Sequence, residues 1–172
     1  MKRMSRCIKE NASTTEMYRE IGHSQISVAL LELAQNSRNW LPYYNFEALP
    51  VHPVLWSMDP FLSNLSKKHE FQAGVLRLPE RTCYNWHTDT DRKVSVNMLL
   101  KDTRSSCLFM GKPGVSFHFY ELHYMPYTYY AFDTQTPHMV LNHEGPRYMF
   151  SLEFLGNSRN LTFDELCADF KD

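Results

Sequence analysis

The sequence predicts a mainly β domain, with a barrel-like or sandwich core and helices packed on its outside. The chain has 172 residues, of which 43% are hydrophobic and 14% aromatic, and this composition suits a β-rich core. From Phe71 onward, β-forming segments alternate with turn residues, giving about six to eight strands over roughly eighty residues. Helical spacing of apolar residues is confined to short segments on either side of these strands. The length fits one domain, and no repeat or linker divides it.

Residues 1–70 are expected to support the β core with helical and irregular segments. Residues 1–22 are polar, which predicts a poorly ordered stretch or an arm. A helix is predicted from Ser24 to Asn36, because apolar residues recur there at helical spacing and Ser24 can act as the N-cap. Residues 40–63 mix Trp, Tyr, Pro and Phe, which favours short strands and irregular aromatic packing over a long helix.

The β core is expected in residues 71–155, followed by a short helix within residues 160–172. A Gly-Lys-Pro-Gly sequence at 111–114 predicts a turn between two of the strands. The helix would follow Thr162, which can form a capping box with Glu165. The predicted strands are Gly74–Leu78, Cys83–Thr88, Lys93–Leu100, Cys107–Met110, Val115–Tyr124, Tyr127–Phe132, His138–Asn142 and Arg147–Phe154.

Composition argues against several classes of partner. A net charge of -1 gives no general attraction to nucleic acids or anionic membranes, so neither is expected as a partner. The longest apolar run near the N-terminus, residues 28–31, is too short to span a bilayer, and no secretory signal is recognisable. The four cysteines contain no C-x-x-C pair and are expected to be reduced thiols in a cytoplasmic protein.

The segment Trp86-His87-Thr88-Asp89 is the first candidate for chemistry. On a strand, residues i and i+2 face the same side, about 6.5 Å apart, so His87 and Asp89 can converge on one metal ion. An imidazole nitrogen with a carboxylate oxygen suits Fe(II), Mn(II) or Zn(II). A His-x-Asp tripeptide also arises by chance, as part of a hydrogen-bonded turn, and therefore needs support from elsewhere in the chain.

His138 is the second candidate and lies fifty-one residues after His87. A turn rich in Thr and Pro leads into the short apolar strand that begins with this histidine. If that strand lies beside the first, two histidines and Asp89 would share one metal ion. Three protein ligands leave positions open for a chelating cosubstrate and O₂, as in non-haem Fe(II) oxygenases. The alternative is an ordinary strand histidine that hydrogen-bonds within the sheet.

Arg147 is the third candidate, nine residues beyond His138 and after the turn at residues 142–146. A hairpin turn there would run the next strand back alongside His138 and place the guanidinium near the metal. A guanidinium inside an apolar barrel needs an anionic partner, and a dicarboxylate cosubstrate would match its geometry. The alternative is an arginine at a strand edge, exposed to solvent.

The order His-x-Asp, strands, His and Arg resembles that of the double-stranded β-helix (jelly-roll, cupin-like) oxygenases that use Fe(II), 2-oxoglutarate and O₂. The residues from Phe132-Asp133 to His138, and from Asn142 to Arg147, look most like the aspartyl/asparaginyl β-hydroxylase branch. The resemblance covers roughly residues 75–154, somewhat under half of the chain. It implies that His87, Asp89 and His138 bind iron and that Arg147 binds the distal carboxylate of 2-oxoglutarate. The best-known members of that branch have glycine where this chain has Asp89.

Further residues are candidates for the cosubstrate and substrate. Within the resemblance, Asn97, or Ser95 on the same strand, could contact the C1 carboxylate of 2-oxoglutarate, and Ser151 shares strand parity with Arg147. An inward serine bonded to backbone is the alternative for Ser151. Residues flanking the metal ligands could line a substrate pocket, although core packing explains the aromatic ones equally well; they are Tyr84, Trp86 and Arg92. The other histidines are not expected to bind metal, since His118 and His123 fall on opposite faces of one predicted strand.

The function that the resemblance implies is hydroxylation of an unactivated carbon, in an amino-acid side chain of a peptide or a free amino acid, or in another small molecule. One rival is a cupin-like metal-binding enzyme or binding module that does not use 2-oxoglutarate, which gives Arg147 no task. A second rival is a non-catalytic β domain in which the histidines and the aspartate meet by accident. Neither the substrate nor the oligomeric state is written in the sequence.

Overall fold

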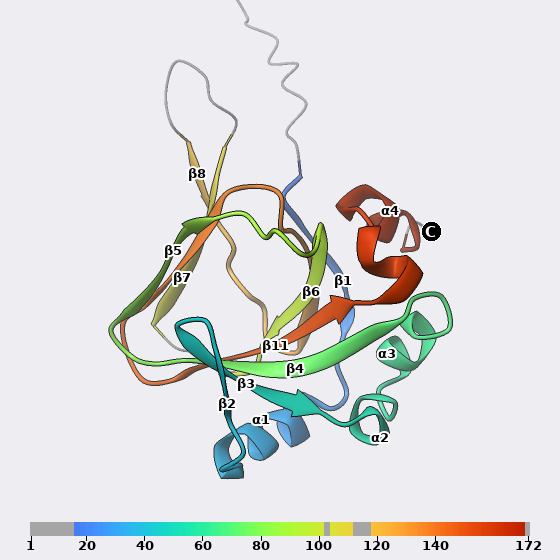
Figure 1. Cartoon of the computed structure of the whole chain (residues 1–172), viewed down its shortest axis with the longest axis horizontal. Coiled ribbons are helices and arrows are strands. Elements are labelled where there is room, and N and C mark those ends of the chain that lie inside the picture. The colour runs from blue at the N-terminus through green and yellow to red at the C-terminus, as the bar shows by residue number, and fades with distance from the viewer. Residues whose placement is uncertain (1–15, 102–103, 112–117, 171–172) are drawn as a thin grey trace, which may run out of the picture.

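The computed structural model describes residues 16–101, 104–111 and 118–170, and it contains two antiparallel β-sheets (Figure 1). The larger sheet has seven strands in the order β1-β9-β6-β11-β4-β3-β2, and the smaller has four in the order β5-β10-β7-β8. This arrangement confirms the predicted mainly β, double-stranded β-helix core. The strands are β1 (Tyr18–His23), β2 (Leu41–Tyr43), β3 (Phe46–Val51), β4 (Phe71–Leu78), β5 (Thr82–His87), β6 (Val94–Leu99), β7 (Ser105–Met110), β8 (Phe119–Glu121), β9 (Thr128–Asp133), β10 (His138–Asn142) and β11 (Arg147–Phe154).

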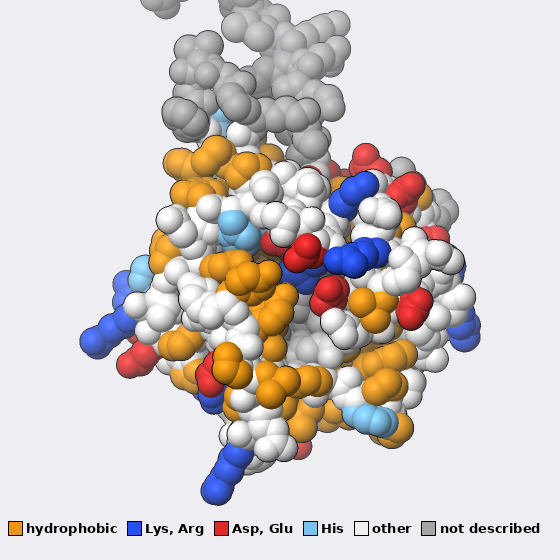
Figure 2. Space-filling model, viewed as in Figure 1, with side chains coloured by type: hydrophobic (Ala, Val, Ile, Leu, Met, Phe, Trp, Pro, Cys, Tyr) orange, Lys and Arg blue, Asp and Glu red, His pale blue; other side chains and the backbone are white. Residues whose placement is uncertain are grey.

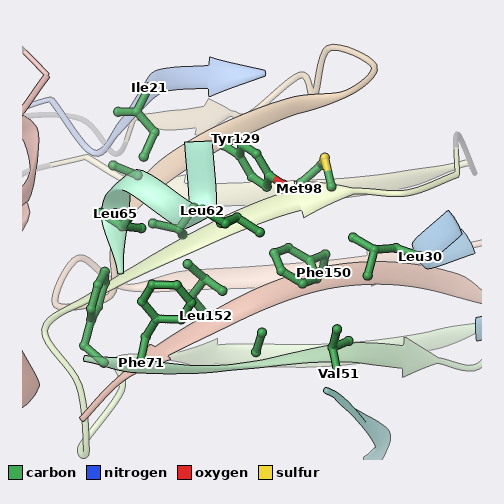
Figure 3. Close-up of a cluster of buried hydrophobic side chains, with 14 of the residues drawn as sticks. Ile21, Leu30, Val51, Leu62, Leu65, Phe71, Met98, Tyr129, Phe150 and Leu152 are labelled. Atoms are coloured by element: carbon green, nitrogen blue, oxygen red, sulfur yellow. The ribbon is translucent and has the colours of Figure 1, made fainter. Parts of the chain in front are cut away.

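Helices cover the outer face of the larger sheet, while its inner face looks toward the smaller sheet (Figure 1). The helices are α1 (Ser27–Asn36), α2 (Pro53–Trp56), α3 (Pro60–Leu65) and α4 (Phe163–Ala168), with a 3₁₀ turn η1 (Gly156–Asn160) before the last. The main core lies between these helices and the sheet, where Leu30, Leu62 and Leu152 are fully buried (Figure 3). Each such side chain contributes roughly 1.5–3 kcal/mol by leaving water. None of the helices in the described part of the chain has the length and apolar character needed to cross a membrane.

Strand β11 shows how one sequence serves both faces of the sheet. Its even-numbered residues, Tyr148, Phe150 and Leu152, pack in the core under the helices. Its odd-numbered residues, beginning with Arg147 and including Ser151, line a cavity on the inner face. The alternation follows from the two-residue period of a strand, and it gives β11 both a structural and a site-forming role.

Several predicted boundaries match the structure closely. Strands β10 and β11 have the predicted bounds, and α4 begins after Thr162 with both halves of the capping box formed by Thr162 and Glu165. Of the four prolines in residues 40–63, Pro53 and Pro60 each occupy the first turn of a short helix, since proline needs no amide hydrogen there. Those two helices are α2 and α3, capped by His52 and Asp59.

Other predictions for local structure were wrong. Helix α1 begins at Ser27, and Ser24 lies outside it, where its hydroxyl accepts a hydrogen bond from the Ile26 amide and donates one to Asp59. Part of the polar N-terminal region forms the edge strand β1, which pairs with β9. Within residues 118–124, the described part of the predicted strand Val115–Tyr124, only β8 is a strand. His118 and His123 lie on either side of β8 and are exposed, while residues 1–15 and 112–117, including most of the predicted 111–114 turn, lie outside the described residues.

The turn after β10 does not form the predicted hairpin. Strand β11 crosses to the larger sheet, where it pairs with β4 and β6, and β10 pairs with β5 and β7 in the smaller sheet. Arg147 therefore reaches the inner cavity from the sheet opposite His138. The crossing is what allows the two sheets to enclose the site from both sides.

Candidate functional site

Two histidines lie side by side where strands β5 and β10 pair. His87 ends β5, His138 begins β10, and the two residues are register partners. Their ring centroids are 4.2 Å apart. The predicted adjacency of the two strands is therefore correct, and the sheet brings together two residues separated by fifty-one positions.

Asp89 completes the group from the loop that follows β5. Its convergence with His87 was inferred from the alternation of side chains on a strand, but β5 ends at His87, and the loop is held by a hydrogen bond from the Asp89 amide to the carbonyl of Thr134. Asp89 Oδ1 lies 3.6 Å from His87 Nε2 and 3.9 Å from His138 Nε2. Two atoms bound to one metal ion at about 2.1 Å are at most about 4.2 Å apart, so these three side chains could hold an ion after small adjustments.

The orientation of both imidazoles suits metal binding. His87 Nδ1 lies 2.6 Å from the carbonyl oxygen of Asn85, and His138 Nδ1 lies 2.9 Å from that of Thr136. Because a carbonyl only accepts, each Nδ1 carries the hydrogen and donates it, which leaves the Nε2 lone pair facing Asp89. Burial lowers the pKa of His138 below its usual value, which favours the neutral imidazole that a metal ion requires.

A β-bulge in β5 turns His87 toward the site. His138 pairs with His87, and Val140 pairs with Tyr84, so β5 has one more residue than β10 between the two pairs. Tyr84 and His87 consequently both line the cavity, although strand alternation alone would place them on opposite faces. Trp86 is not among the lining residues, and its ring stacks on Phe119 with centroids 5.5 Å apart.

Arg92 holds the second oxygen of the Asp89 carboxylate. Its Nε donates to Asp89 Oδ2 at 2.5 Å, which leaves Oδ1 facing the histidines. Its Nη1 also lies 3.4 Å from the hydroxyls of Ser95 and Ser151. Arg92 thus lines the cavity, and its contact with Asp89 gives it an orienting role that sequence reasoning missed.

Asn97 and Ser151 both line the cavity, and both are buried. Ser95 connects them, since its hydroxyl lies 3.0 Å from Asn97 Oδ1 and 3.2 Å from the Ser151 hydroxyl. The Ser95 hydroxyl also donates to the carbonyl of Leu152 at 3.0 Å, so part of this network ends on backbone. The structure brings these polar residues to the cavity wall without assigning any of them to a ligand.

Arg147 is a buried cation in the same cavity, with 6% of its surface exposed. Its Nε donates to the Ser105 hydroxyl at 3.2 Å, and its guanidinium carbon lies 5.7 Å from the centre of the Tyr124 ring. Within the described residues, no carboxylate lies close enough to Arg147 to form an ion pair. A buried guanidinium without a negative partner is costly, so this site is suited to an anionic ligand.

Tyr124 and Cys107 surround Arg147, and sequence reasoning missed both. Burial raises the pKa of the Tyr124 phenol well above its ordinary value, so the hydroxyl stays neutral and able to donate. Burial likewise raises the pKa of the Cys107 thiol to about 11, and the nearby Arg147 offsets only part of that effect. Neither residue belongs to a motif; strand parity on β7 was the one available signal for Cys107.

The cavity that contains these groups measures about 310 Å³. Its buried end holds Arg147 and Tyr124, and its mouth lies beside the hairpin of β2 and β3. On the face of the molecule seen in Figure 2, hydrophobic side chains gather left of the centre, and acidic and basic side chains lie to the right of it. Such a volume accommodates a small dicarboxylate together with part of a second molecule.

Comparisons with known proteins identify the fold. No family model matches the chain, and no curated relative matches it. Among solved structures, a prolyl-4-hydroxylase from Pseudomonas putida aligns with a TM-score of 0.60 at 17% identity, over 81% of this chain and 92% of that one. A prolyl hydroxylase from Trichoplax adhaerens, in complex with a hypoxia inducible factor peptide fragment, aligns with a TM-score of 0.62 at 14% identity, over 84% and 86%.

A third solved structure, an oxidoreductase of the 2OG-Fe(II) oxygenase family from Burkholderia pseudomallei, aligns with a TM-score of 0.54 at 12% identity. That alignment covers 74% of this chain and 76% of the other. At these identities the alignments show a shared fold, that of the double-stranded β-helix oxygenases.

Proposed function

We propose that this protein is an Fe(II)- and 2-oxoglutarate-dependent dioxygenase that hydroxylates an unactivated carbon. The observation that carries the proposal is the presence, in one cavity, of a convergent His87–Asp89–His138 group and a buried Arg147 without a carboxylate partner among the described residues. The fold shared with two prolyl hydroxylases and a 2OG-Fe(II) oxygenase supports this assignment. Fold similarity alone would not, because one fold hosts many activities.

The residues fit the groups that this function requires. Two neutral Nε2 atoms and one carboxylate oxygen are the donor set of facial-triad Fe(II) sites, and they leave ligand positions open. Arg147 would bind the distal carboxylate of 2-oxoglutarate through its guanidinium, next to the Tyr124 hydroxyl. Iron and 2-oxoglutarate bound there would supply the oxidation, in which O₂ gives one oxygen atom to the substrate and one to succinate as CO₂ leaves.

The other cavity residues would position these groups. Arg92 occupies Asp89 Oδ2 and so favours metal binding through Oδ1 alone. Asn97 and Ser151 would contact the cosubstrate from β6 and β11, where both face the cavity. The apolar walls formed by Leu76, Leu78 and Phe132 would exclude water from the reacting atoms.

The substrate that we propose is an amino-acid side chain, carried by a peptide or free. One of the structures with this fold is a prolyl hydroxylase in complex with a peptide, which supports the peptide form. The matched structures named above give no support to the aspartyl/asparaginyl hydroxylase branch, so the proposal stays at the level of 2-oxoglutarate oxygenases. The rival hypothesis, a cupin-like metal-binding protein that does not use 2-oxoglutarate, gives no reason for the burial of Arg147.

Anaerobic titration with Fe(II) and then 2-oxoglutarate tests the proposal. Chelation of iron by the keto acid should produce a weak visible charge-transfer band in the wild-type protein and none in His138→Ala. His143→Ala serves as a matched control, because that histidine is exposed and lies outside the cavity. A folded wild-type protein that binds iron without developing the band would contradict the use of 2-oxoglutarate. One that binds no iron would contradict the whole assignment.

A further inference from the structure

The cavity continues beyond the proposed metal site. A second hollow of about 200 Å³ adjoins the first, and the two share five lining residues: Tyr43, Leu76, Arg92, Ser151 and Glu153. It runs along the inner face of β3 and β4, where Pro50, Gln72 and Gly74 line it. A substrate that fills both hollows is larger than a free amino acid.

Four aromatic rings form one wall of the cavity mouth. Tyr43 and Phe46 lie 5.2 Å apart, and Phe46 and Tyr84 lie 5.3 Å apart, between ring centroids. Tyr44 packs edge-on against Tyr43 at 4.8 Å, yet 71% of its surface is exposed. Its φ of 52° belongs to the two-residue turn between β2 and β3, which holds the ring beside the cavity mouth. Exposed rings beside a cavity offer their faces to an apolar or cationic group.

The charges that line the cavity do not balance. Its cations are Arg92 and Arg147, and its carboxylates are Asp89, Asp91 and Glu153. Asp89 pairs with Arg92, and an Fe(II) ion and a 2-oxoglutarate dianion cancel each other in charge. The charges that remain are Arg147, Asp91 and Glu153, so the loaded cavity as a whole carries one net negative charge with neutral histidines.

The two carboxylates that have no ion-pair partner among the described residues are near the mouth. Asp91 is exposed in the loop between the metal ligand Asp89 and strand β6, and Glu153 is half-buried near the outer end of β11. Glu153 accepts a hydrogen bond from the amide of Gln72, and neither it nor Asp91 is ion-paired within the part of the chain that the structure describes. Rings on one wall and uncompensated carboxylates on the other are the two features that bind ammonium and guanidinium groups.

We propose that the mouth of this cavity selects a substrate side chain that bears one positive charge, a lysine or an arginine. The proposal rests on the proposed function for the chemistry, and on the rings and carboxylates of the mouth for the selection. The adjoining hollow would bind residues that flank the cationic one in a peptide. A free lysine or arginine would occupy the mouth alone. Filling the adjoining hollow by mutation therefore distinguishes a peptide substrate from a free amino acid.

Binding of short peptides that differ only at the central residue tests the proposal. The probes are alanine-rich octapeptides with central lysine, arginine or the uncharged norleucine, measured with protein loaded with Mn(II) and N-oxalylglycine, an unreactive analogue of 2-oxoglutarate. The lysine and arginine peptides should bind about tenfold more tightly than the norleucine peptide at low salt, and this preference should shrink as salt is added.

The double variant Asp91→Asn/Glu153→Gln should reduce that preference to less than threefold. Glu32→Gln/Glu80→Gln makes the same change in net charge at two exposed carboxylates outside the cavity, and it should keep the preference. Gly74→Leu would fill the adjoining hollow, and it should weaken peptide binding while leaving binding of N-acetyl-lysine amide unchanged.

Equal binding of lysine and norleucine peptides would overturn the proposal, as would a full preference in the double variant. Binding is measured without turnover, and on the unloaded protein as well as the loaded one, so the result does not depend on the outcome of the charge-transfer experiment. A preference for cations without a 2-oxoglutarate band would retain the selection and reject the proposed function. A charge-transfer band without the preference for cations would retain the proposed function and reject the selection.

Discussion

Arg147 lowers the stability of the ligand-free protein, because its charge is buried and no carboxylate among the described residues forms an ion pair with it. Residues kept at such a cost are typical of binding sites, where stability is exchanged for affinity. The hydroxyl of Ser105 and the ring of Tyr124 contribute only neutral contacts. The cost should therefore disappear when an anionic ligand binds, or when the charge is removed.

Arg147→Met should raise the free energy of unfolding of the ligand-free protein by about 1 kcal/mol, since methionine fills a similar space without a charge. The same variant should lose the stabilisation that 2-oxoglutarate confers on wild type through binding to the native state. Urea titrations with and without 2-oxoglutarate measure both effects, with the exposed Arg104→Met as control. A loss of more than 2 kcal/mol without ligand would mean that Arg147 is mainly structural.

Arg92 should matter for metal affinity although it is not itself a ligand. Arg92→Gln removes the bond that fixes Asp89 Oδ2, so the carboxylate can rotate, and affinity for Co(II) should fall about 10- to 100-fold. Arg77→Gln is the matched control, because Arg77 pairs with Glu47 away from the metal-binding group. Absorption titrations with Co(II) report the affinity, and unchanged binding in Arg92→Gln would show that Asp89 needs no such support.

At the level of elements, one buried carboxylate joins several segments of the helical layer. Asp59 is fully buried and caps α3 by accepting from the amides of Phe61 and Leu62. Its other oxygen accepts from the Ser24 hydroxyl and the Gln25 amide before α1, and from the Tyr129 hydroxyl on β9. The carboxylate thus satisfies five donors that would otherwise be poorly paired.

Asp59→Asn should lower the free energy of unfolding by about 2–4 kcal/mol, because an amide group would face donors where a carboxylate oxygen accepted. Asp164→Asn, at an exposed position in the first turn of α4, should cost about 0.5 kcal/mol. Chemical denaturation of both variants gives the comparison. Similar small losses in the two would show that water replaces the missing acceptor at Asp59.

For the whole molecule, an ion pair joins segments one hundred residues apart. Asp169, at the end of α4, contacts His69 Nε2 at 2.6 Å and Lys68 Nζ at 3.0 Å, just before β4. Burial acts to raise the pKa of Asp169, but the hydrogen bonds from His69 and Lys68 outweigh it, and the pKa lies below the usual 3.8. This contact links the C-terminal helix to the helical layer on the larger sheet.

Because the folded-state pKa of Asp169 is depressed, its contribution to stability is complete above the unfolded pKa and is lost as the pH falls through the folded one. Asp169→Asn should therefore cost about 1 kcal/mol at pH 6, and this difference from wild type should begin to shrink as the pH falls below about 3.8 and vanish below the folded-state pKa. Unfolding free energies measured from pH 2 to pH 7 test this. A constant difference across that range would assign the effect to packing rather than to charge.

Much of the fold and site could be predicted from the sequence because the relevant signals are local. Strand alternation located β10 and β11, and the capping box located α4. Both patterns can be read because they involve only residues that are a few positions apart in the sequence. The chemical character of His87, Asp89, His138 and Arg147 likewise predicted a site for a metal ion and an anionic ligand. The sequence by itself thus determined the residue types that the site uses and the strands that present most of them.

Only the tertiary structure decided how those residues meet, because sheet order and bulges are set by packing between distant segments. The bulge in β5 turns His87 inward, and the Thr134 carbonyl anchors the loop that carries Asp89. The crossing of β11 brings Arg147 to the cavity from the opposite sheet, where Tyr124 meets it. No local pattern encodes these contacts, since each depends on two segments folding against one another.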